Sequence, residues 1–171
     1  MRRRRLLALA LSGVSVAALG LASVTQFTPR LIWNASESAP LGLYRTEQGV
    51  PKIGDYVLVQ PNRDIEILIV ERGYLPDNIP LLKRVAALPG AEICRKGEGI
   101  FIDGSLIAEA LPVDSAGRVL PIWQGCIILS ANEVFLLNDP KNSLDGRYFG
   151  ATDLDDVIGV VVPLWVEESE R

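Results

Sequence analysis

The pattern of apolar and polar residues along most of this chain predicts short β-strands. Apolar runs of strand length, each bounded by turn-type residues, occur at 56–59, 81–88, 91–95, 126–130, 133–139 and 157–166. Asp103-Gly104 separates two further short runs and is a strong signal for a two-residue hairpin. We therefore expect a mainly β domain with coiled or barrel-like sheets and little helix.

The segment 62–74, NRDIEILIVERGY, fits two different elements. Acidic residues near its start and Arg72-Gly73 at its end favour a short helix. Its isoleucine and valine content equally permits a strand. The pattern leaves both open.

The amino-terminal end carries an apolar run that is much longer than a strand. Leu6 to Val24 comprises 19 residues without a charge, and Arg2 to Arg5 precede it. As a helix, this run would cover about the thickness of the hydrocarbon layer of a membrane. By the positive-inside rule the arginines would stay in the cytoplasm, which predicts a single span in the cytoplasmic (inner) membrane.

A cleaved signal peptide is the alternative, with Gly20 and Ala22 as a weak cleavage site. The uncharged run exceeds the usual length of a signal-peptide apolar region, so we favour a retained anchor. The expected organisation is a basic end and transmembrane anchor over 1–28 and one extracytoplasmic, periplasmic domain over 29–171.

Composition excludes several classes of function. The chain of 171 residues has no histidine, which excludes Ser-His-Asp and Cys-His hydrolases and histidine-ligated metal sites. Beyond Arg5, 13 basic residues face 21 acidic ones, so no nucleic-acid surface is expected. The spacing of Cys94 and Cys126 matches no zinc or redox motif; one disulfide and two buried thiols both fit. We expect neither a metal nor another cofactor.

Lys83 is the lysine that the pattern places in an apolar run, between Leu82 and Arg84-Val85. Burial disfavours the ammonium form and lowers a lysine pKa, which would make Lys83 a usable general base. The alternative is that Lys83 buries only its stem and extends its amine to water.

Ser38 is the candidate nucleophile for such a base. Pro40 restricts Ala39 to extended geometry, and this constraint fixes where the neighbouring side chain points. In a Ser-Lys mechanism the neutral amine takes the hydroxyl proton while Oγ attacks a peptide carbonyl. Ser36 could then stabilise the oxyanion with its hydroxyl, beside the N–H of Ser38. Alternatively, Asn34 to Ser38 is only a polar linker.

Four motifs together resemble a known family. SESAPLGLY, GDYVLV, LLKRVAALPG and NSLDGRYFG occur in the order and approximate spacing of the membrane-anchored signal peptidases of the S26 type. Ser38-Ala39-Pro40 followed by Gly42-Leu43-Tyr44 is similar to the TraF branch, the maturation peptidases of conjugative transfer, whereas bacterial type I enzymes carry Ser-Met-x-Pro. The resemblance covers Arg2 to Val166.

The resemblance implies a role for individual residues. Ser38 corresponds to the nucleophile, Lys83 to the general base and Ser36 to the residue that assists the oxyanion. Ser143 corresponds to the serine that hydrogen-bonds the lysine. Asp145 and Arg147 correspond to a pair that braces the site; the alternative for them is a turn with an ordinary surface ion pair.

Some positions depart from the family pattern. Ala91 stands where many signal peptidases have aspartate, and Asn138-Asp139-Pro140 replaces their Gly-Asp-Asn. We assign these positions no role. The 62–77 region has no counterpart in the motifs, and we interpret it as a substrate-facing insertion.

The resemblance implies a membrane-anchored serine endopeptidase that cleaves an exported precursor. For the TraF branch, that precursor is a conjugative pilin, and an amine could replace water and cyclise it. One alternative is a general type I signal peptidase. The other is an inactive membrane-tethered β domain that helps to assemble a pilus or secretion complex.

Overall fold

The computed structural model describes residues 11–16, 20 and 30–167. Its β-strands are β1 (Leu31–Asn34), β2 (Gly42–Glu47), β3 (Tyr56–Val59), β4 (Leu81–Ala87), β5 (Glu92–Lys96), β6 (Gly99–Ile102), β7 (Ser105–Glu109), β8 (Gly125–Ile128), β9 (Glu133–Leu136), β10 (Thr152–Asp153) and β11 (Val157–Val166). Within residues 30–167 the helices are α2 (Arg63–Glu71), α3 (Gly146–Phe149) and the 3-10 turn η1 (Leu154–Asp156).

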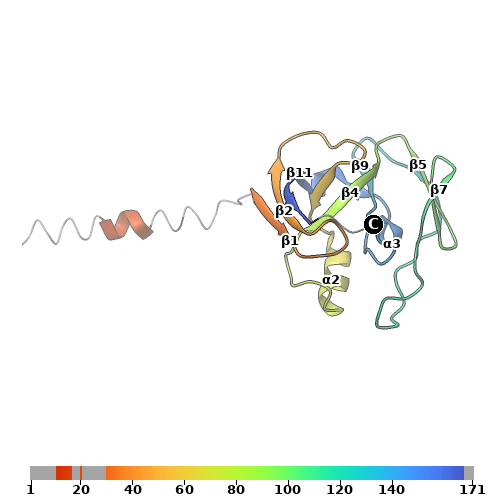
Figure 1. Cartoon of the computed structure of the whole chain (residues 1–171), viewed down its shortest axis with the longest axis horizontal. Coiled ribbons are helices and arrows are strands. Elements are labelled where there is room, and N and C mark those ends of the chain that lie inside the picture. Colours follow the sequence, from red (N-terminus) through yellow and green to blue (C-terminus); the bar gives the residue numbers. More distant parts are fainter. Residues whose placement is uncertain (1–10, 17–19, 21–29, 168–171) are drawn as a thin grey trace, which may run out of the picture.

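The strands form two antiparallel sheets. The larger sheet has the order β1-β2-β11-β3-β4-β9-β10, and the smaller one has the order β7-β6-β5-β8. The larger sheet curls, and the smaller sheet stands to one side of it (Figure 1). The predicted mainly β domain with few helices is confirmed.

Two buried clusters meet at β4 and β9. One packs Ile65 and Ile69 of α2 against the larger sheet. The other fills the space between the sheets and includes Ala87, Ile93 and Phe135. Because β4 contributes to both clusters, it is a rigid support for the side chains that it carries.

Residues 63–71 of the 62–74 segment form the helix α2, so the strand interpretation is wrong. Asn62 caps α2, since its side chain accepts a hydrogen bond from the N–H of Ile65 at 3.1 Å. Ile65 and Ile69 lie one helical turn apart, and both are buried against the sheet. That buried face favours a helix over a strand.

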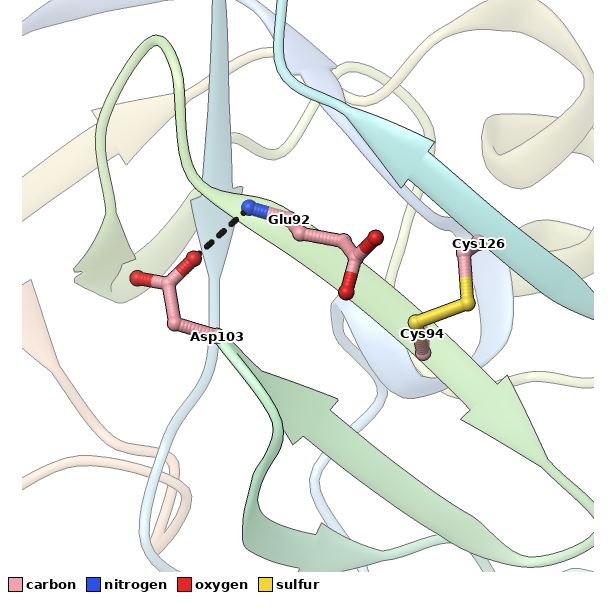
Figure 2. The surroundings of a disulfide bond; sticks show 4 residues. All are labelled: Glu92, Cys94, Asp103 and Cys126. Atoms are coloured by element: carbon pink, nitrogen blue, oxygen red, sulfur yellow. Dashed lines mark hydrogen bonds between the residues drawn. A yellow bond between two sulfur atoms is a disulfide. The ribbon is translucent and has the colours of Figure 1, made fainter.

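The cysteines form a disulfide, so the interpretation as free thiols is wrong. Cys94 on β5 lies directly opposite Cys126 on β8 in the antiparallel register. Figure 2 shows the bond, with Asp103 accepting a hydrogen bond from the N–H of Glu92. Asp103 and Gly104 both have positive φ angles, of 48° and 80°, and join β6 to β7 as the predicted hairpin.

The expected anchor over 1–28 lies mostly outside the described residues. Residues 11–16 and 20 are helical. A search restricted to the described residues finds no helix that is long and apolar enough to span a membrane.

Candidate active site

Ser38 lies in the loop between β1 and β2, here called the serine loop (residues 35–41). The side chain of Asn34, only 7% exposed, holds this loop together. Its Nδ2 donates to the carbonyl oxygens of Ser36, Ala39 and Pro40 at 2.9, 3.0 and 3.0 Å. Its Oδ1 accepts from the N–H of Ser36 at 3.1 Å. One buried amide therefore fixes the backbone on both sides of Ser38.

The two serine hydroxyls of this loop are in contact. The Oγ atoms of Ser36 and Ser38 lie 3.0 Å apart, and the N–H of Ser38 donates to Ser36 Oγ at 3.4 Å. Ser36 is exposed and Ser38 is half-buried. The Ser36 hydroxyl and the Ser38 N–H, the two groups expected as oxyanion donors, thus lie in contact with each other.

Lys83 is buried in the middle of β4. It is 3% exposed, so the interpretation in which its amine extends to water is wrong. Its Nζ donates to Ser143 Oγ at 3.0 Å. Burial lowers the pKa of Lys83 from 10.5 to about 8; Asp145 opposes this change and Arg147 adds to it. A fraction of the amine is therefore neutral near pH 7.

Asn138 holds the backbone on both sides of Lys83. Its Nδ2 donates to the carbonyl oxygen of Leu82 at 3.0 Å, and its Oδ1 accepts from the N–H of Arg84 at 2.9 Å. Asn138 is 2% exposed. The family motifs assign this position no role, and its two hydrogen bonds hold the backbone beside Lys83. The available signal was an asparagine directly after the apolar run of β9, because a buried polar side chain needs partners.

Asp145 and Arg147 form a buried ion pair beneath the site. Their side chains are 0% and 2% exposed, with Arg147 Nη1 3.3 Å from Asp145 Oδ2. The interpretation as a surface pair is therefore wrong. The 140–150 segment, which is polar in sequence, folds inward and forms α3 over Gly146–Phe149.

Each member of this pair also binds backbone. Arg147 donates to the carbonyl oxygens of Asn138, Pro140 and Ser143 at 2.5, 2.8 and 3.5 Å. Asp145 accepts from the N–H groups of Asn138 and Arg147, each at 3.1 Å. Burial raises the pKa of Asp145, while Arg147 and Lys83 oppose that rise. The pair thus fixes the segment that carries Ser143.

Ser36, Ser38, Lys83 and Ser143 line one cleft of about 760 Å³. Asp145 and Arg147 do not line it and lie behind Ser143. Across residues 30–167, Lys83 and Ser38 do not hydrogen-bond to each other; Lys83 Nζ bonds to Ser143 and Ser38 Oγ to Ser36. Catalytic hydrogen bonds often form only when substrate binds.

The cleft holds no group of metal ligands among the described residues. The one such group lies on the smaller sheet, where Glu92 is close to Cys94 and Cys126. Both sulfur atoms are joined in the disulfide, as Figure 2 shows. They are therefore not available as thiolate ligands.

Comparisons with known proteins show the family of this chain. The family model described as signal peptidase, peptidase S26, matches residues 3–165. The chain belongs to this family, and its role is of the peptidase type.

Sequence relatives define the branch within the family. The plasmid transfer protein TraF of Escherichia coli is 32% identical over 142 residues, which cover 77% of this chain and 80% of the relative. The conjugal transfer protein TraF of Agrobacterium tumefaciens (strain 15955) is 33% identical over 174 residues, covering 95% and 96%. The chain is thus an S26 signal peptidase of the TraF type, as the motifs predicted.

A solved structure is also similar. The crystal structure of a signal peptidase I from Enterococcus faecalis V583 matches with a TM-score of 0.40 at 19% identity, covering 67% of this chain and 98% of that chain. The assignment rests on the family match and the sequence relatives.

Proposed function

We propose that this protein is a membrane-anchored serine endopeptidase in which Ser38 is the nucleophile and Lys83 the general base. The observation that carries the proposal is the burial of Lys83 at the wall of the cleft that Ser38 also lines. An amine with its pKa lowered to about 8 is neutral often enough to accept a proton near neutral pH.

The reaction has two stages. Lys83 takes the proton of Ser38 as Oγ forms a bond to the carbonyl carbon of the scissile peptide. The tetrahedral intermediate collapses, the C–N bond breaks, and the proton passes from Lys83 to the leaving amine. Water then releases the acyl group from Ser38, with Lys83 as the base again. An amine of the same substrate could replace water and close a cyclic product.

The serine loop supplies the oxyanion donors in this proposal. The N–H of Ser38 and the hydroxyl of Ser36 bind each other at 3.4 Å, and the substrate oxygen takes the place of that contact. Ser143 orients Lys83 through the 3.0 Å hydrogen bond. Asp145 and Arg147 support Ser143 from behind through the bond to its carbonyl oxygen.

The substrate is proposed to be an exported precursor, in particular a conjugative pilin precursor. This follows from the relatives, which are named for plasmid and conjugal transfer. The disulfide suits the proposed periplasmic location, since such bonds persist in oxidising compartments. A single span within residues 1–28 would hold the cleft near the membrane from which the precursor emerges.

The test uses the full chain in detergent or vesicles with a candidate pilin precursor. Intact-mass spectrometry of the products distinguishes cleavage from cyclisation, because a cyclic product lacks the mass of one water. We expect wild type to process the precursor and Ser38→Ala to leave it intact. Ser105→Ala, which changes an exposed serine on β7, is the matched control. Processing that survives in Ser38→Ala would contradict the proposal.

A further inference from the structure

The cleft extends well beyond the side chains proposed to react. Away from Ser38 and Lys83 it continues between the end of α2 and the loop 110–120, which follows β7. We call this part the apolar chamber. Its lining is formed by Leu75, Ile79, Leu111, Val113, Leu120 and Leu144.

The apolar chamber leaves apolar surface open to water. Ile79 and Val113 are 42% and 40% exposed, although they lie in a concave wall. Apolar surface in a concave site gains free energy when another apolar group covers it. The methyl side chain of a substrate alanine bound beside Ser38 would fill little of a cleft of about 760 Å³. The chamber therefore fits a much larger apolar group.

A set of polar contacts, here called the clasp, fixes the two walls of the chamber to each other. Arg72 donates to the carbonyl oxygen of Val119 at 2.8 Å, and Arg118 donates to the carbonyl oxygen of Arg72 at 3.2 Å. Asp114 accepts hydrogen bonds from Tyr74 and from Arg118. The two bonds between Arg72 and residues 118–119 join segments 46 and 47 positions apart in sequence.

The clasp makes the chamber a preformed site. Asp114 also lies 3.6 Å from Arg72, and the guanidinium of Arg118 stacks over the ring of Tyr74 at 5.3 Å. Hydrogen bonds from Tyr74 and Arg118 lower the pKa of Asp114, so the clasp persists through mildly acidic pH. A preformed pocket binds its ligand without first paying the entropy of ordering a loop.

We propose that the apolar chamber is a substrate subsite that selects a bulky apolar side chain of the precursor, such as leucine or phenylalanine. The chamber and the reacting side chains belong to one continuous cleft, so a peptide that reaches Ser38 can also enter the chamber. Side chains of an extended peptide alternate at about 3.3 Å per residue, which places the selected residue a few positions from the cut. The segment that follows α2 and carries Leu75 and Ile79 thereby contributes to substrate specificity. This inference rests on the proposed peptidase function.

The test separates binding from cleavage. The probes are fluorescent peptides that span the expected cleavage site of a candidate pilin precursor, with alanine at every position near the cut and one leucine or phenylalanine moved along the chain. Dissociation constants are measured on Ser38→Ala protein by fluorescence anisotropy, and kcat/KM is measured on the wild type. At one or two positions, we expect the bulky residue to improve both values about tenfold or more.

The variants Ile79→Asp and Val113→Asp test the chamber directly. Both positions are substantially exposed, so the fold should tolerate the change, which thermal melting by circular dichroism verifies. Each variant should abolish the gain from the bulky residue, so that the peptide with leucine or phenylalanine and the all-alanine peptide give the same values. Ile128→Asp, on an exposed edge strand outside the cleft, is the matched control and should keep the gain.

The outcomes distinguish this inference from the proposed function. Equal rates for all peptides, or a gain that persists in both chamber variants, would overturn the subsite while leaving the peptidase intact. A second result is that the bulky residue improves binding to Ser38→Ala protein and the chamber variants lose this gain, while wild type leaves the precursor and all peptides uncut. That result would support the subsite and contradict the proposed peptidase function.

Discussion

The serine loop and the Lys83 strand hold their side chains in opposite ways. The hydrogen bonds of Asn34 in the serine loop join residues at most six positions apart, and the hydroxyl of Ser36 is exposed. Lys83 is buried in a central strand whose polar contacts come from Asn138 and Ser143, 54 to 60 positions away. The contacts of the serine loop are therefore local and exposed to solvent, whereas the contacts around Lys83 are long-range and exclude water.

In the proposed mechanism, the difference follows from what each group has to do. A nucleophile must meet a substrate that arrives from solvent, so a short loop with its own internal bonds can present it. A lysine base must lose its hydration, and that requires packing from several distant segments. Changes in the two regions should therefore have different signatures.

The largest effects are expected from Ser38→Ala and Lys83→Ala. Each removes a group that forms or breaks a bond, and we expect processing of the precursor to fall by about 10⁴-fold or more. Lys52→Ala, at an exposed lysine, should retain full activity. Product formation measured by mass spectrometry provides the rates. Substantial activity in either variant would remove the distinction between the two regions.

The next largest effect concerns stability. Asp145→Asn leaves the buried Arg147 without its counter-charge, and we expect the free energy of unfolding to fall by about 3–5 kcal/mol. Glu47→Gln breaks the exposed pair with Arg45 and should cost less than about 1 kcal/mol. Urea denaturation followed by tryptophan fluorescence measures both. Equal losses would mean that the buried pair does not support the lysine region.

A smaller effect on turnover is expected from Asn34→Ala. The change removes four hydrogen bonds from the serine loop, so we expect kcat to fall about 10- to 100-fold. The pH dependence should stay the same, because Asn34 has no contact with Lys83. Asn132→Ala, at an exposed asparagine, is the control. A shifted pH profile in Asn34→Ala would show that the two regions are not independent.

The smallest effect is expected from Ser143→Ala. Its hydroxyl accepts a bond from Lys83 Nζ, and losing that acceptor disfavours the ammonium form. Activity should fall about tenfold at most, and the inflection of kcat/KM against pH should move to lower pH. A profile that keeps its inflection would exclude Ser143 as a positioning residue for the lysine.

The sequence predicted the parts of this molecule that depend on local patterns. The strand at 81–88 and the hairpin at Asp103-Gly104 follow from apolar periodicity and turn chemistry. The burial of Lys83 was one of two interpretations that the pattern left open, and the structure decides between them. The amides of Asn34 and Asn138 were missed, because their bonds depend on which backbone groups the fold leaves without partners. The 62–74 segment was undecided, since its apolar residues fit both the helical and the strand period. Packing of Ile65 and Ile69 against the sheet, which only the tertiary structure shows, favours the helix.

The sequence also could not predict the surroundings of the ion pair. Asp145 and Arg147 stand in a polar segment that is indistinguishable from a surface turn by composition. Their burial arises because Arg147 satisfies three backbone carbonyls that the folded segment turns inward. Contacts of this kind are properties of the tertiary structure alone.

The ionisation of Lys83 is the quantity on which the catalytic account depends. The ¹³Cε shift of this lysine, followed by NMR across the pH range with Lys83→Arg protein for assignment, reports its protonation directly. We predict a midpoint near 8, matched by a rise in kcat/KM with increasing pH through the same value, because the neutral amine is the active form. A lysine that stays protonated up to its ordinary value of 10.5, in an enzyme already fully active at pH 7, would contradict the account.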